Sequence, residues 1–244
     1  VSSFALPLSF ATHFMVNGQE FLIPMLTEEP SVVAAASKGA KIARKHGGFT
    51  CKPVSADMIG QIQIIPTKIP HAERLITTFL NKNKEKLLII AKETDEILID
   101  LGGGPKDLTW HTIKTDRGTM IILHLIVDVK DAMGANTVNT MVEKISQSLH
   151  SGHRLDNPNH IEFNKLAIIN LKIISNLSLL RMAECSAIFD KQLIGGDAIV
   201  NRILDAYHFA LNDPYRATTH NKGIMNGIDA LCLATGNDFR AVEA

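Results

Sequence analysis

The stretch LTWHTIKTDRGTMIILHLIVDV (108–129) decides how this sequence folds. Two runs rich in Thr, Ile, Leu and Val, 108–114 and 119–129, flank a short turn, 116–118, that ends in glycine. Such residues favour extended backbone, and a short turn with glycine joins antiparallel strands. The stretch therefore predicts a β-hairpin.

The segments on either side of this hairpin each supply one strand and one helix. Upstream, MIGQIQIIP (58–66) is typical of a strand, and 70–93 has its apolar residues on one side, as an amphipathic helix does. Downstream, 135–150 predicts a helix and 164–171 a further strand. The order β-α-β-β-α-β is that of a split βαβ, or ferredoxin-like, domain.

A larger domain surrounds this one in the sequence. Before it, Asn17-Gly18 between two strand-like runs predicts another hairpin, and Pro30 marks the start of a helix. After it, 168–188 resembles a strand passing into a helix, and 198–211 is amphipathic. We therefore expect an α+β fold in which a small domain, 58–163, is inserted into a larger mixed helix and sheet domain formed by 1–57 and 164–244.

Composition excludes several classes of function. The 244 residues are 45% hydrophobic, with 25 basic and 25 acidic side chains. Zero net charge argues against a general affinity for nucleic acid or anionic membrane. No apolar run reaches the roughly 18 residues of a membrane span, no secretory signal is visible, and the scattered histidines predict no metal site. The three cysteines, without CxxC spacing, fit small core residues in a reducing cytoplasm.

The segment 216–243 combines charged residues with an apolar run. Lys222 and Asp238 flank IDALCLAT, which should pack in a core. A lysine at a core edge has its pKa lowered unless a carboxylate holds its charge, so a Lys–Asp pair here predicts a site. The alternative, which the residues leave open, is two surface charges on either side of a buried helix.

Two acids, Glu28 and Glu29, precede Pro30 at the start of a helix. Acids at a helix N-terminus stabilise its dipole, which is the simpler interpretation. The sharper one is that a carboxylate faces a site, while the small side chains of 34–36 let the helix pack closely. The residues alone do not separate these interpretations.

The run DAMGAN (131–136) lies between the strand of 119–129 and the helix that follows. Small residues at a helix start let backbone N–H groups approach an anion, which the helix dipole favours. The run is not GxGxxG, so no Rossmann fold is predicted. A simple turn with an acid as helix cap remains the alternative.

Three stretches together resemble class II hydroxymethylglutaryl-CoA reductase, the bacterial and archaeal type. They occur in the family's order and are PMLTEEPSVVAAAS (24–37), VDVKDAMGANTVNTM (127–141) and THNKGIMNGIDALCLATGNDFRAVEA (219–244). The resemblance spans essentially the whole chain. It implies reduction of hydroxymethylglutaryl-CoA to mevalonate and coenzyme A, by two hydride transfers from a nicotinamide cofactor, or the reverse oxidation, in isoprenoid synthesis.

The resemblance also implies roles for residues of the larger domain. Lys222 would stabilise negative charge on the carbonyl oxygen and supply a proton, Asp238 would hold the lysine, and Glu29, with its pKa raised by burial, would protonate the aldehyde oxygen. Substrate would be bound by Ser31, Arg216 and Asn226, with Asn226 also orienting Glu29.

In the small domain the resemblance implies a dinucleotide site. The pyrophosphate turn would comprise Asp131, Ala132, Met133, Gly134, Ala135 and Asn136. Asp95 would accept from the adenosine ribose and repel a 2′-phosphate, which favours NADH over NADPH.

The family's active site forms at a dimer interface, so we expect a homodimer or higher oligomer, with neither nucleic acid nor membrane as partner. The family's N-terminal coenzyme A motif and C-terminal histidine have no match here, so we expect a piece of a longer protein.

Two alternatives stay open. One is an aldolase-type enzyme in which Lys222 forms a Schiff base with Asp238 as acid-base partner. The other is a catalytically incomplete fragment that binds nucleotide.

Overall fold

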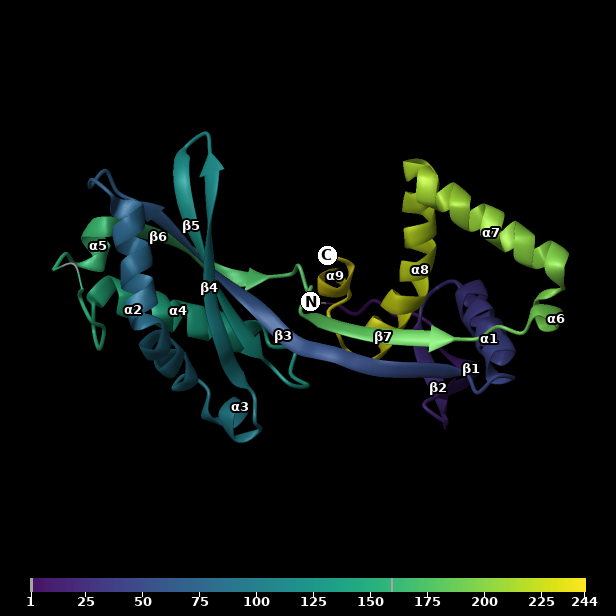
Figure 1. Cartoon of the computed structure of the whole chain (residues 1–244). Coiled ribbons are helices and arrows are strands. Elements are labelled where there is room, and N and C mark those ends of the chain that lie inside the picture. Colours follow the sequence, from purple (N-terminus) through teal and green to yellow (C-terminus); the bar gives the residue numbers. More distant parts are fainter. Residues whose placement is uncertain (1, 159) are drawn as a thin grey trace. The chain divides into compact units, whose positions relative to one another are not determined.

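The computed structural model describes residues 2–158 and 160–244, and the chain divides into two compact units (Figure 1). Unit 1 comprises Val1–Pro53 with Ala183–Ala244, and unit 2 comprises Val54–Met182. Unit 2 extends past the predicted boundary at 163 because β6 (Ala167–Ser175) pairs with β3 (Phe49–Pro66). The division into a substrate domain and a dinucleotide domain stays a prediction.

Unit 2 has the predicted βαββαβ order, which confirms the α+β fold class. Strand β5 pairs antiparallel with both β3 and β4, and β6 pairs antiparallel with the other edge of β3, giving the order β4-β5-β3-β6. One helix follows β3 and another follows β5. The bounds are β4 Gly104–Thr115, β5 Gly118–Asp128, α2 Ala72–Lys92 and α4 Ala135–Ser151, with two short helices, α3 Glu96–Asp100 and α5 Phe163–Leu166, that the sequence did not predict.

The core of unit 2 lies between one face of this sheet and its two long helices. Alternate residues of β3 and β5, such as Ile62, Ile64 and Leu123, are fully buried. They pack against α2 and α4, whose buried residues recur every three or four positions. The helix α4 is thereby fixed against the sheet, and its N-terminus follows the end of β5.

Unit 1 begins with the predicted hairpin, β1 (Leu8–Val16) and β2 (Gln19–Leu26). Asn17 and Gly18 both have positive φ, 50° and 79°, as a type I′ turn requires. Helix α1 (Pro30–Arg44) starts at Pro30 as predicted and packs on β1. The small core here includes Ala11, Met25 and Ala230, the last from α8 (Pro214–Ala234).

The prediction for 168–188 was wrong in its second half. After β6 the chain forms a second strand, β7 (Arg181–Ala187), and both strands pair with β3. Backbone hydrogen bonding to a neighbouring strand therefore outweighs the helical character of the sequence. The rest of unit 1 is helical: α6 Lys191–Ile194, α7 Asp197–Asn212, which confirms the prediction for 198–211, α8, and α9 Phe239–Glu243.

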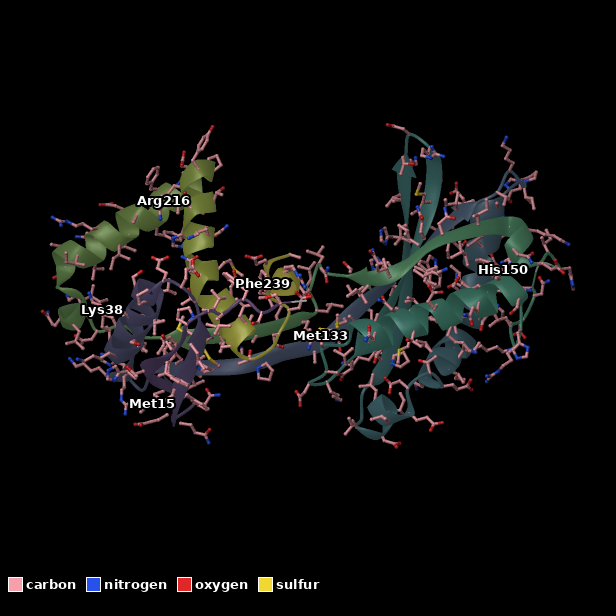
Figure 2. All side chains as sticks on the ribbon, turned by 180° about the vertical axis from the view of Figure 1, so that it is seen from behind. Met15, Lys38, Met133, His150, Arg216 and Phe239 are labelled. Atoms are coloured by element: carbon pink, nitrogen blue, oxygen red, sulfur yellow. A yellow bond between two sulfur atoms is a disulfide. The ribbon has the colours of Figure 1, made fainter. Side chains whose placement is uncertain are left out.

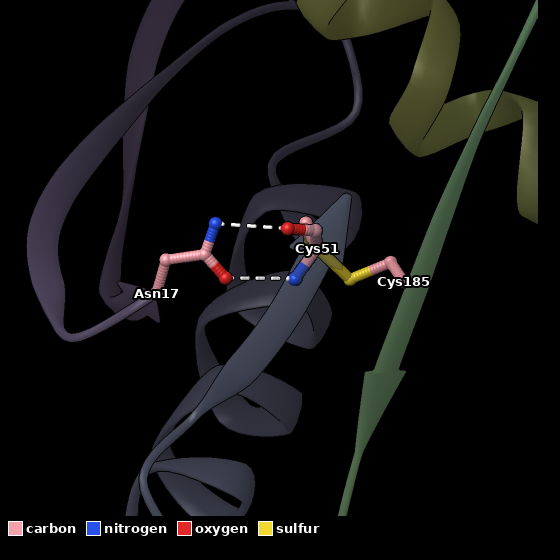
Figure 3. Close-up of a disulfide and its surroundings, with 3 residues drawn as sticks. All are labelled: Asn17, Cys51 and Cys185. Carbon is pink, nitrogen blue, oxygen red and sulfur yellow. Dashed lines mark hydrogen bonds between the residues drawn. A yellow bond between two sulfur atoms is a disulfide. The ribbon is translucent and has the colours of Figure 1, made fainter. Parts of the chain in front are cut away.

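The prediction that the cysteines are small core residues was also wrong for two of them. Cys51 of β3 and Cys185 of β7 form a disulfide (Figure 3). Asn17 accepts from the Cys51 N–H and donates to its carbonyl, both at 2.9 Å. The two cysteines are 134 residues apart, so their contact depends on strand pairing that spacing does not reveal. Cys232 is free and partly buried.

Among the described residues, no helix combines the length and the apolar character that crossing a membrane needs.

Candidate active site

The start of α1 presents Glu29 and Ser31. Glu29 is the N-cap residue of α1, and Pro30 follows as the first helical residue. The Ser31 hydroxyl donates to Glu29 Oε1 at 2.7 Å, which fixes the carboxylate at the positive end of the helix. Both side chains are exposed, so the burial predicted for Glu29 is not seen in this chain. The helix places Glu29 at its tip, beyond the small core that Ala36 contacts.

The middle of α8 faces the start of α1. A groove of about 360 Å³ separates the two helices, and its walls come from both. Small side chains make this close approach possible: Ala35 and Ala36 on α1, and Gly223 and Gly227 on α8. The polar members of the lining are Ser31 and Asn226. Two predicted substrate-binding residues that are 195 positions apart (226 − 31) therefore line the same groove.

Lys222 lies on α8 one helical turn before Asn226, so the two share a face of the helix. It is exposed and has no ion-pair partner within the described part of the chain. Arg216 is in the first turn of the same helix, where its N–H donates to the N-cap Asp213 at 2.6 Å. Thus α8 carries three of the predicted site residues.

Asp238 is not paired with Lys222. It is the N-cap residue of α9, where its Oδ1 accepts from the N–H groups of Arg240 and Ala241 and from Arg240 Nε at 3.3 Å. The hydrogen bond from the Arg240 side chain lowers the pKa of Asp238. The predicted Lys222–Asp238 pair does not form because the guanidinium of Arg240, two residues after Asp238, binds the Asp238 carboxylate. The expected core packing of α8 is also limited, since Ala230 is its one buried residue.

The turn 131–136 and the N-terminus of α4 lie in unit 2. Gly134 is the N-cap residue with φ +88°, and no side chain caps the helix. A Cβ at Gly134 would lie 2.6 Å from Met58 Sδ and 2.8 Å from Val129 Cγ1, so only glycine fits. Asp131 and Met133, the latter labelled in Figure 2, are exposed on the turn. The uncapped first turn has the free N–H donors that an anion needs.

Asp95 lies beside this turn. It caps α3, with Oδ1 accepting from the Leu98 N–H at 2.9 Å. Its Oδ2 accepts from the Thr137 hydroxyl, in the first turn of α4, at 2.9 Å. The carboxylate therefore ties α3 to the N-terminus of α4 and remains partly exposed.

The sequence reasoning missed a charged network at the end of β5. Burial raises the pKa of Asp128. Hydrogen bonds from the Lys130 N–H and from the ammonium groups of Lys130 and Lys106 lower it by more, so the pKa lies below its ordinary value. Lys106 also contacts Asp57 at 2.6 Å. The signal available in the sequence was two lysines: Lys130, directly before the turn 131–136, and Lys106, on β4.

Comparison with known proteins identifies the family. A family model described as hydroxymethylglutaryl-coenzyme A reductase matches residues 1–244. The chain belongs to the hydroxymethylglutaryl-CoA reductase family. It is 49% identical over its whole length to the reductase of Archaeoglobus fulgidus and 29% identical over 243 residues to the probable reductase of Borreliella burgdorferi. It covers 52% of each, so it spans about half the length of these curated relatives.

Solved structures of reductases agree with this assignment. The class II reductase of Streptococcus pneumoniae, described as bound to NADPH in open conformations, aligns with all of this chain at a TM-score of 0.88 and 36% identity. A second structure of the S. pneumoniae reductase gives a TM-score of 0.87, also at 36% identity. In both cases the alignment covers 63% of the other chain. The fold of this reductase family member is therefore that of class II.

Proposed function

We propose that this chain takes part in the nicotinamide-dependent reduction of hydroxymethylglutaryl-CoA to mevalonate and coenzyme A, or in the reverse oxidation. The observation that carries the proposal is the groove between α1 and α8. It places Ser31 and Asn226 together, with Glu29 at one side and Lys222 one turn away on the other helix. An acid, an ammonium and two neutral hydrogen-bonding groups are what a carbonyl reduction needs from the protein.

Each hydride addition to a thioester or aldehyde builds negative charge on the carbonyl oxygen. We assign stabilisation of that charge to the Lys222 ammonium, and protonation of the aldehyde oxygen to Glu29. The Ser31 hydroxyl, now donating to Glu29 Oε1, holds the carboxyl at the groove. Asn226 supplies an amide to the substrate or to Glu29. The Arg216 guanidinium suits the free carboxylate of the substrate because its planar fork donates two parallel hydrogen bonds.

Asp238 is proposed to tune Lys222, although in this structure it is paired with Arg240. Arg240 is largely exposed, and solvent screens exposed ion pairs, so the Asp238–Arg240 pair is weak. Releasing Asp238 from Arg240 therefore costs little. An Arg240→Ala variant tests this: it should leave kcat within about threefold of the wild type if Lys222 is the functional partner.

The residues of unit 2 fit a nicotinamide dinucleotide. The first turn of α4 has no side-chain cap and no acid of its own, and the turn before it depends on Gly134, where a Cβ would meet Met58 and Val129. When bound, the dinucleotide supplies the hydrides. Asp95 is placed to accept from a ribose hydroxyl, since its carboxylate is already held beside α4 by Thr137. We propose NADH or NADPH as the cofactor, with a modest preference for NADH.

We further propose a homodimer or higher oligomer. Helix α7 has no buried residue in this chain, and Ile203, Leu204 and Tyr207 are each at least half exposed. Apolar faces of this kind are covered in stable assemblies. Replacing Ile203 and Tyr207 together by Glu should convert the assembly to monomers in sedimentation experiments. A wild-type chain that sediments as a monomer would contradict the proposal.

The direct test follows nicotinamide absorbance with hydroxymethylglutaryl-CoA in the full-length protein. Lys222→Ala should lower kcat by about a hundredfold or more, as loss of a charge-stabilising donor does. Lys41→Ala is the matched control, because Lys41 is an exposed lysine in the last turn of α1. Retained activity in Lys222→Ala refutes the lysine assignment. Trapping of substrate on Lys222 by borohydride would instead favour a Schiff-base enzyme.

A further inference from the structure

The side chain of Arg181 holds the turn 131–136 from outside. This arginine is the first residue of β7 and lies in unit 2. Its two terminal nitrogens bind two successive carbonyls: Nη2 donates to the Ala132 oxygen at 2.8 Å, and Nη1 donates to the Met133 oxygen at 2.9 Å. Nη1 also lies 3.1 Å from Met58 Sδ.

These two hydrogen bonds fix the peptide planes on both sides of Met133. In a trans peptide the carbonyl of one residue and the N–H of the next point in opposite directions. Because the Ala132 and Met133 carbonyls point at Arg181, the N–H groups of Met133 and Gly134 point away from it. Neither N–H donates to a backbone carbonyl in the described part of the chain. Successive N–H groups that end at a left-handed residue, here Gly134 at φ +88°, form a concave anion-binding nest.

Arg181 also brings an uncompensated positive charge to the turn. The structure shows no carboxylate partner for it among the described residues, since its recorded contacts are the two carbonyls and the Met58 sulfur. Its position is itself fixed, because the carbonyl of the preceding Leu180 accepts from the Asp57 N–H at 3.1 Å. A fixed cation within about 3 Å of the backbone favours an anion at the opposite side of the turn.

We propose that Arg181 is a positioning residue for dinucleotide binding: it orients the 132–134 backbone so that the Met133 and Gly134 N–H groups face the diphosphate. This rests on the proposed function. Arg181 itself does not touch the diphosphate in this proposal. A lysine in its place keeps the charge but donates to only one carbonyl in a fixed direction, because an ammonium lacks the planar fork.

The test compares Arg181→Lys and Arg181→Met with the wild type by calorimetric titration of the full-length protein. The ligands are NADH, NADPH, ADP and adenosine. Loss of one oriented, charge-assisted contact should weaken NAD(P)H and ADP about tenfold in Arg181→Lys and about a hundredfold in Arg181→Met. Adenosine, which has no diphosphate, should bind all three proteins equally. The KM for hydroxymethylglutaryl-CoA should not change.

Arg154→Met is the matched control. Arg154 also makes a two-pronged contact in unit 2, to Glu93 at 2.6 and 2.8 Å, but it lies outside the turn. This variant should lose similar thermal stability and keep its affinity for ADP. If Arg154→Met and Arg181→Lys weaken ADP equally, or if adenosine weakens with ADP, Arg181 is merely structural and the inference fails. If the wild type binds neither NADH nor NADPH, the proposed function fails instead.

Discussion

The two ends of α4 offer a controlled comparison of backbone strain and steric exclusion. Gly134 before the helix and Gly152 after it both have left-handed backbone, with φ of +88° and +69°. A Cβ on Gly152 would meet nothing within 4 Å. A Cβ on Gly134 would lie 2.6 Å from Met58 Sδ and 2.8 Å from Val129 Cγ1. Replacing each by alanine therefore adds similar backbone strain, but adds a clash only at Gly134.

The magnitudes follow from these environments. Left-handed backbone costs an alanine about 1–2 kcal/mol, of which reduced freedom in the unfolded chain offsets about 0.4–1 kcal/mol. Gly152→Ala should thus lower the free energy of unfolding by about 1 kcal/mol. At Gly134 the methionine can move, but the β-branched Val129 is stiff at χ1 and fully buried. Overpacking of this kind adds about 1–3 kcal/mol, so Gly134→Ala should cost about 2–4 kcal/mol.

Urea unfolding followed by circular dichroism measures both variants. The midpoint should shift further for Gly134→Ala, with the slope unchanged in both cases. Titration with ADP should show weaker binding for Gly134→Ala alone, because the displaced turn carries the proposed donors. Equal destabilisation by the two substitutions would refute the steric argument, and unchanged ADP affinity in Gly134→Ala would refute the placement of the anion.

Three further perturbations test other parts of the structure. The Cys51–Cys185 bridge closes a loop of 134 residues, so replacing both cysteines by serine should lower the free energy of unfolding by about 2–5 kcal/mol. Reductant should lower the melting temperature of the wild type and leave that of the variant unchanged. Buried Asn83 binds the 156 backbone N–H and carbonyl at 2.7 and 2.9 Å, so Asn83→Ala should cost about 2–3 kcal/mol in urea unfolding. Lys86→Ala, which removes only an exposed ion pair, should cost much less. Burial lowers the pKa of His124 in the folded chain below its ordinary value. The contribution of the neutral imidazole to stability is therefore present above the ordinary pKa and is lost as pH falls through the folded pKa. His124→Gln removes this titrating group, so the melting temperature should fall less between about pH 7 and 5.

The part of the fold that the sequence predicted is the part set by local patterns. Alternation of buried and exposed residues marks β3 and β5, and the buried stripe of α4 recurs every three or four residues. Glycine turns separate these elements. The strand β7 and the disulfide lacked such a signal, because both depend on β3, whose relevant residues lie more than 100 positions earlier.

The candidate site divides in the same way. Ser31 and Asn226 were predicted from resemblance to family motifs. They line one groove because the alanines and glycines between the two helices, which are visible in the sequence, let the helices approach closely. Arg181 was not found, because its contacts are to backbone carbonyls nearly 50 positions away, at 132 and 133. Every residue has a backbone carbonyl, so no sequence pattern indicates which carbonyls an arginine will bind.

Glu29 and Lys222 are exposed, whereas their proposed chemistry needs water to be excluded from the site. Proton transfer and charge stabilisation are strong only where water is excluded. The groove of about 360 Å³ is near the small end of the roughly 300–1,000 Å³ typical of ligand pockets, so it suits an acyl group and not a whole coenzyme A thioester. In the proposed function the remainder of the substrate lies outside this groove and covers the exposed Glu29 and Lys222 side chains. On this reasoning the binding energy of the coenzyme A part is used to exclude water from the reacting carbonyl, and a shortened thioester should lose kcat as well as affinity.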